Sequence, residues 1–145
     1  MPEEKIPSIM REFVKTMEDG DVEKSLAYFA EDGVWINPNG TFKGKDELRR
    51  CTAAMYDQIK NIKVKECGLG IIAQGNKAFF EHELSGMAGG KKVAFLAMCA
   101  YEFAGGKIKE VRTTFDRLNV AQQSTGGLPK MMVNMMVKQA EKGLR

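Results

Sequence analysis

The sequence predicts an α+β fold: a cone-shaped, curled antiparallel sheet with three N-terminal helices packed in its concave face, followed by a C-terminal helical tail. In the first part of the chain, apolar residues recur at helical spacing. From Ile62 onward they alternate, and turns containing glycine separate the runs. These runs exceed the usual strand length of ~5 to 6 residues, and long strands twist and curl. A curled sheet with helices on one face forms a cone.

The N-terminal part of the chain predicts three helices and a short strand. Apolar spacing predicts a first helix over 6–17 and a second that starts at the candidate N-cap Asp21 and ends at Asp32-Gly33. A short strand follows from Val34 to Asn37. The third helix is expected over about 45–59.

Four long antiparallel strands are expected in the second half, over about 62–74, 77–87, 91–103 and 107–115. The strand over 91–103 is apolar on both faces, so both faces should be covered. Because the helices cover only one face, we predict a homodimer through the outer face of the sheet.

The composition changes near residue 125, so we divide the chain into a domain over 1–125 and a tail over 126–145. Pro129 suits the first turn of a tail helix that carries four of the ten methionines: Met131, Met132, Met135 and Met136. This helix either packs on the body or on a dimer partner, or it closes over a site as a lid, since methionine adapts to apolar ligands of varied shape.

Composition argues against several classes of function. The 22 basic and 19 acidic residues give a net charge of +3, too small an excess to predict a nucleic-acid partner. Three widely spaced cysteines and one histidine predict neither a metal site nor a disulfide framework, and free thiols favour the cytoplasm. No apolar leader or membrane-spanning run is present. Dinucleotide and Walker motifs are also missing, so we predict no cofactor.

The only histidine, His82, lies in the stretch FFEHELSG. Within its strand, His82 shares one face with Phe80 and Leu84, while Glu81 and Glu83 point to the other. Two carboxylates cannot both be buried without partners, so their face is the wetter one. His82 is therefore expected to point into the cone.

The cone predicts an apolar chamber with few polar groups. Its expected apolar lining is Trp35, Phe80, Leu84, Phe95, Ala97 and Tyr101. Its expected polar groups are His82, Asn37, Thr113 and Asp116. For two of these a structural alternative stays open, because Asn37 also suits the turn at Pro38 and Asp116 also suits a cap on a helical turn beginning at Leu118.

This order of elements resembles the nuclear transport factor two-like (NTF2-like) fold, which includes ketosteroid isomerase, limonene epoxide hydrolase and the SnoaL-like polyketide cyclases. The resemblance covers about residues 5–124. Its most specific match is GGKIKEVRTTFDRLNVAQQSTG, Gly105 to Gly126, which resembles the ending of SnoaL-like proteins. DGDVEKSLAYFAEDGVWINPNG is similar to the superfamily at large.

Position by position, the resemblance places Asn37 where ketosteroid isomerase has its base aspartate, and an amide cannot abstract a proton. It places His82 and Thr113 at the positions of the two catalytic aspartates of the epoxide hydrolase, and Phe80 at the position of its arginine. Because this set of residues, which activates water, is missing here, the resemblance argues against epoxide hydrolysis. Asp116 matches the second of two aspartates on the last strand of SnoaL-like proteins.

The resemblance and the residues together predict a cofactor-independent enzyme acting on a small hydrophobic carbonyl compound. Neutral His82 would take the proton next to the carbonyl, and Asn37 or Thr113 would donate a hydrogen bond to the enolate. Asp116 would orient the imidazole or act as the acid. The enzyme with these groups would be an isomerase or an aldol-type cyclase. The alternative is a non-catalytic domain that binds a small hydrophobic ligand or dimerises.

Overall fold

The computed structural model describes residues 2–144. Its elements are the 3₁₀ helix η1 (Glu3–Lys5), α1 (Ile6–Asp19), α2 (Val22–Leu26), β1 (Phe29–Asn37), β2 (Gly40–Lys43), α3 (Gly44–Gln58), β3 (Lys60–Gln74), β4 (Lys77–Ala88), β5 (Lys91–Ala104), β6 (Lys107–Phe115), α4 (Arg117–Ser124) and α5 (Gly127–Ala140).

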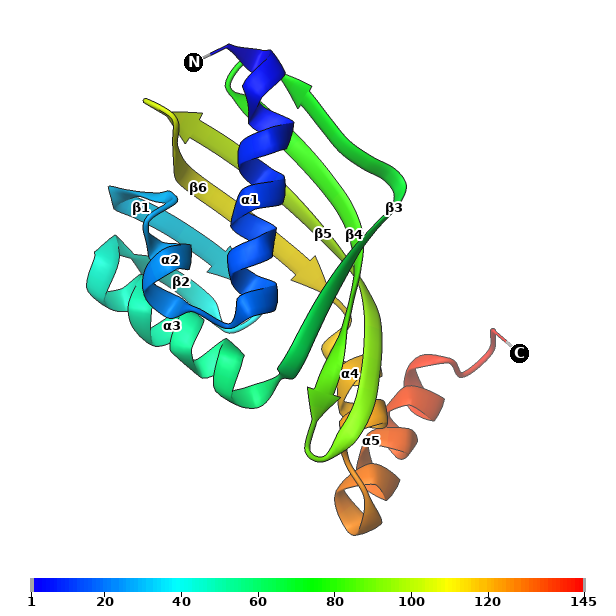
Figure 1. Ribbon diagram of the computed structural model, residues 1–145. Coiled ribbons are helices and arrows are strands. Elements are labelled where there is room, and N and C mark those ends of the chain that lie inside the picture. Colours follow the sequence, from blue (N-terminus) through cyan, green and yellow to red (C-terminus); the bar gives the residue numbers. More distant parts are fainter. Residues whose placement is uncertain (1, 145) are drawn as a thin grey trace.

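The strands form one curled, unclosed sheet in the order β2-β1-β6-β5-β4-β3. The four long strands pair antiparallel as predicted, whereas β1 pairs parallel with β6. Figure 1 shows α1 lying across one face of the sheet, with α2 and α3 on the side of β1 and β2. The predicted α+β fold class is confirmed.

Helix α1 turns its apolar stripe toward the sheet. Ile6, Met10 and Phe13 are almost completely buried, at intervals of three or four residues. The helix ends at Gly20, whose positive φ of 66° allows its N–H to reach the carbonyls of Met17 and Thr16.

The second helix is shorter than predicted. It starts after the expected N-cap Asp21 but ends at Leu26, and Phe29 opens β1 instead of continuing the helix to Asp32-Gly33. Lys45 of α3 donates hydrogen bonds from Nζ to the carbonyls of Leu26 and Phe29, which satisfies the helix end. The prediction was wrong because Phe29 continues the helical stripe in the sequence, while the contact that ends the helix comes from a distant residue.

Strands β4 and β5 alternate as the sequence predicted. Ala78, Phe80, His82 and Leu84 of β4 are buried, and they pair with the buried positions Tyr101, Cys99, Ala97 and Phe95 of β5. These residues form the concave wall of the sheet and join the core with α1. The inward direction of His82 thus follows from strand periodicity.

The outer face of β5 is only partly covered in the single chain. Gln123 of α4 accepts a hydrogen bond from the N–H of Ala94 and donates one to its carbonyl, which pairs the backbone edge of β5 where β6 has ended and leaves Ala94 exposed. Leu96 is 49% exposed. The homodimer therefore stays a prediction.

Helix α4 contacts β5, and α5 lies beyond it, away from the sheet (Figure 1). Helix α5 contacts α4 and has no buried residue among those described. Within residues 2–144, no helix combines the length and the hydropathy that a membrane span requires.

Candidate functional site

A pocket of about 290 Å³ lies between the concave face of the sheet and helices α1 and α3. This volume is at the lower end of the range for small-molecule sites, ~300–1,000 Å³. The pocket, here called the chamber, is lined by nine of the predicted site residues: Trp35, Asn37, Phe80, His82, Leu84, Phe95, Ala97, Tyr101 and Thr113. Asp116 is not among its lining residues.

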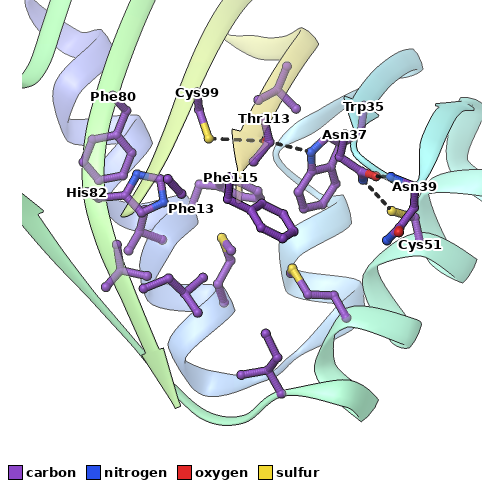
Figure 2. Close-up of a pocket in the computed structure, with 18 of the residues that line it drawn as sticks. Phe13, Trp35, Asn37, Asn39, Cys51, Phe80, His82, Cys99, Thr113 and Phe115 are labelled. Carbon is purple, nitrogen blue, oxygen red and sulfur yellow. Dashed lines mark hydrogen bonds between the residues drawn. The ribbon is translucent and has the colours of Figure 1, made fainter. Parts of the chain in front are cut away.

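Figure 2 shows how the chamber separates two groups of side chains. His82 and Phe80 project from β4 on one side. Trp35 and Asn37 of β1 lie on the other side, near Cys51 of α3. A ligand in the chamber would contact both walls.

His82 is 5% exposed and stacks on Phe80, with 4.2 Å between ring centroids and 22° between ring planes. No hydrogen bond of ordinary length reaches its Nδ1 from any described residue, and that atom is fully buried. Burial lowers the pKa of His82 to about 4, and the interaction with the backbone of Phe80 acts in the opposite direction. The imidazole is therefore neutral at neutral pH.

Thr113 of β6 holds Trp35 in place. Its Oγ1 accepts a hydrogen bond from Trp35 Nε1 at 2.9 Å and lies 3.3 Å from the Sγ of Cys99. Burial raises the pKa of the Cys99 thiol to about 11, so it is protonated. Thr113 thus fixes the indole on the chamber wall, and these two contacts leave its hydroxyl one hydrogen-bonding site, either the O–H or one lone pair.

Asn37 is also held by protein groups. Its Oδ1 accepts a hydrogen bond from the N–H of Asn39, and its Nδ2 donates to the Sγ of Cys51 at 3.3 Å. The first contact shapes the turn between β1 and β2, which is the structural alternative raised for Asn37. The residue nonetheless lines the chamber, and one N–H of its amide has no acceptor among the described residues.

Asp116 occupies the N-cap of α4. Its Oδ1 accepts a hydrogen bond from the N–H of Asn119 at 3.1 Å, and its side chain is exposed. The capping alternative is the one that the structure shows. The expected role of Asp116 beside the imidazole is corrected, because a carboxylate that caps α4 outside the chamber cannot orient His82.

The sequence did not single out several residues that line the chamber. Phe13 and Met17 of α1 and Cys51 of α3 belong to helical stripes that predict burial, which was the available signal. Arg50 also lines the chamber, and nothing in the sequence distinguishes it from other surface arginines. Its position depends on how α3 is rotated against the sheet.

No aspartate or glutamate among the described residues lines the chamber. Over residues 2–144 there is also no group of three or more residues suited to hold a metal ion. The chemistry of the chamber therefore depends on one neutral imidazole, amide and hydroxyl groups, protonated thiols and the guanidinium of Arg50.

Solved structures share this fold. A hypothetical protein with a ketosteroid isomerase-like fold from Catenulispora acidiphila, solved with trimethylamine, has a TM-score of 0.74 and 19% identity over 81% of this chain and 92% of that chain. An LEH-like epoxide hydrolase from M. tuberculosis has a TM-score of 0.66 and 21% identity over 90% of this chain and 93% of that chain. An NTF2-like protein from Burkholderia xenovorans has a TM-score of 0.67 and 21% identity over 86% of this chain and 99% of that chain.

These likenesses establish the fold without assigning a role to any residue. No curated protein sequence matches the chain. The family comparison is more specific, because the SnoaL-like domain matches residues 10–111, from α1 to the middle of β6. The chain therefore belongs to the SnoaL-like domain family.

Proposed function

We propose that the chain binds a small, mainly apolar molecule in the chamber and that His82 forms a hydrogen bond with the molecule's polar group. The observation that carries this proposal is a neutral imidazole that lines an apolar chamber and has no hydrogen bond of ordinary length at its Nδ1. Buried polar groups normally have a partner, and leaving one unpaired costs about 1 to 3 kcal/mol. A ligand that bonds to the ring through Nε2, which is not among the fully buried atoms, would give the imidazole a hydrogen bond inside the chamber, while Nδ1 would stay enclosed by protein.

A carbonyl group suits this position. A neutral imidazole carries one N–H and one lone pair, and the N–H donates to a carbonyl oxygen when the tautomer places it on the chamber side. The volume of about 290 Å³ limits the ligand to a small molecule. The proposed ligand class is therefore a small hydrophobic carbonyl compound.

The geometry favours binding over proton abstraction. An imidazole with a pKa of about 4 is a weak base, and effective general bases have a pKa near the working pH. No carboxylate lies in the chamber to stabilise an imidazolium. Thr113 lies 3.3 Å from the Sγ of Cys99, and when its O–H donates to that sulfur it is not available to an enolate.

Proton abstraction is the second candidate, because His82 is neutral at neutral pH and faces the chamber, and because the family includes isomerases and cyclases. In this reaction, His82 takes the proton from the carbon next to the carbonyl and leaves an enolate and an imidazolium. An isomerase returns the proton to another carbon. In a cyclase, the enolate carbon attacks a second carbonyl, whose oxygen then takes the proton.

Trp35 provides the binding test, because it lines the chamber and is the chain's only tryptophan. Titration with 2-octanone should change its fluorescence. In His82→Phe, affinity for 2-octanone should fall about three- to tenfold, as expected for one net hydrogen bond, while ethylbenzene, which has no polar group, should bind as before. Equal loss for both probes, or no binding in the unaltered protein, would reject the proposal.

Proton exchange separates the two candidates. NMR in deuterated water follows exchange of the hydrogens next to the carbonyl of 2-octanone. The binding proposal predicts the buffer rate with and without protein. Exchange accelerated by the protein and lost in His82→Ala would support catalysis instead.

The three cysteines are free, with Cys51 and Cys99 buried and Cys67 half-buried, which supports a cytoplasmic location as part of this proposal.

A further inference from the structure

The rim of the chamber is formed by four lining residues that are also exposed to solvent: Asn39, Arg50, Ala54 and Gln58. Three of them are spaced four residues apart along α3, so they lie on one side of that helix. Asn39 belongs to the turn between β1 and β2. The opening thus has a polar edge, in contrast to the apolar interior.

Arg50 is the only lining residue among those described that carries a full charge at neutral pH. His82 does not, because its pKa is about 4. A guanidinium placed where an apolar chamber meets water is suited to an anionic group on a molecule whose body lies inside.

Arg50 also lacks an ion-pair partner among the described residues, although carboxylates are near it in the sequence. Asp46 lies 3.2 Å from Arg49, and Arg49 also pairs with Glu23 at 2.7 Å. Glu47 instead accepts a hydrogen bond from the N–H of Lys43 at 2.7 Å. The five donor groups of Arg50 are therefore available to a ligand.

The surface next to the rim has a second cation. A shallower hollow shares Asn39 and Gln58 with the chamber and is lined by Arg117, which donates a hydrogen bond to the carbonyl of Pro38. The single acidic residue lining that hollow, Asp57, lies 3.5 Å from Lys60. The local charge at the opening is therefore positive.

We propose that the chamber takes an amphipathic anion, a small hydrophobic molecule with a carboxylate that Arg50 binds at the rim. This inference rests on the proposed function, because it names a further group on the ligand whose body occupies the chamber. Its carboxylate stays in water at the opening, where it keeps most of its hydration, while the apolar part is buried.

The test compares octanoate with octanamide, which has a similar shape and no charge, by the fluorescence of Trp35 at neutral pH. Octanoate should bind more tightly. In Arg50→Gln its affinity should fall about fivefold, in keeping with a partly exposed charge pair, and the affinity for octanamide should stay the same. Added salt should weaken octanoate binding alone.

Arg49→Gln is the matched control, because Arg49 is the neighbouring arginine and does not line the chamber. Equal affinities for octanoate and octanamide, or equal losses in the two variants, would overturn the anion proposal. Binding of 2-octanone in that case would leave the proposed function intact. If 2-octanone, octanamide and octanoate all fail to bind, the proposed function fails, and this inference fails with it.

Discussion

Trp35 Nε1 donates a hydrogen bond to Thr113 Oγ1 at 2.9 Å, between two residues 78 positions apart in the chain. The two strands that carry them, β1 and β6, form the only parallel pair in the sheet over the described residues. This contact holds the indole against the chamber wall. Thr113, which the resemblance places at a catalytic position, here positions another lining residue.

We expect Thr113→Val to destabilise the protein by about 1 to 2 kcal/mol, because the buried indole N–H loses its acceptor while the volume of the side chain is kept. Denaturant unfolding followed by Trp35 fluorescence measures this change. Thr114→Val is the control, because Thr114 is exposed on the opposite face of β6. Equal destabilisation by both variants would contradict the importance of the contact.

The stability should depend on pH through His82. The pKa of His82 is about 4 in the folded protein against an ordinary value of 6.5, so the unfolded chain takes up the proton first as the pH falls. The free energy of unfolding should therefore decrease from pH 6.5 toward pH 4, by at most about 3 kcal/mol, and should not change through this group above pH 6.5.

Because the chain has one histidine, the pKa of His82 can be measured directly. Proton NMR should show one imidazole signal that does not titrate until the pH is well below 6. His82→Gln should have a flatter dependence of unfolding free energy on pH between 4 and 6.5 than the unaltered protein. An imidazole that titrates near 6.5 would show that the ring is not desolvated as described.

Two substitutions of Asp116 separate capping from catalysis. Asp116→Ala should destabilise α4 by about 1 kcal/mol, whereas Asp116→Asn should cost little, because asparagine caps helices about as well as aspartate. Hydrogen exchange of the amides in α4 reports the difference. Loss of ligand binding or of any proton exchange activity in Asp116→Asn alone would return this carboxylate to the site.

The predicted homodimer can be tested at two surfaces. If the outer face of the sheet forms the interface, Leu96→Glu should convert dimers to monomers in analytical ultracentrifugation, because it would bury a charge between two apolar faces. Leu128 of α5 is 63% exposed, and Leu128→Glu tests whether the tail forms the dimer contact. Dissociation by Leu128→Glu in place of Leu96→Glu would assign the contact to the tail, and a monomeric unaltered protein would reject the dimer.

The boundary near residue 125 leads to a further prediction. Because α5 has no buried residue, a chain of residues 1–125 should unfold at nearly the same denaturant concentration as the full chain. A large decrease would show that the tail stabilises the domain. Faster release of 2-octanone from the shortened chain would support the lid alternative for the methionine-rich helix.

The faces that β1, β4 and β6 turn inward could be predicted from the sequence. Phe80, His82 and Leu84 are buried as the alternation in β4 indicated. Helix ends were less predictable, since α2 ends where Lys45, almost twenty residues later, bonds to its last carbonyl. Helical spacing in the sequence cannot show such a contact.

The sequence by itself determined the order of the elements, the side chains that face inward and the presence of one histidine in a mainly apolar lining, because periodicity is a local property of the chain. Only the tertiary structure decided which polar groups are free. Thr113, Asn37 and Asp116 have protein partners, whereas no hydrogen bond of ordinary length reaches His82 Nδ1, and Arg50 has no partner among the described residues. The physical reason is that hydrogen-bond partners depend on strand register, on the curl of the sheet and on the rotation of α3, which bring distant residues together.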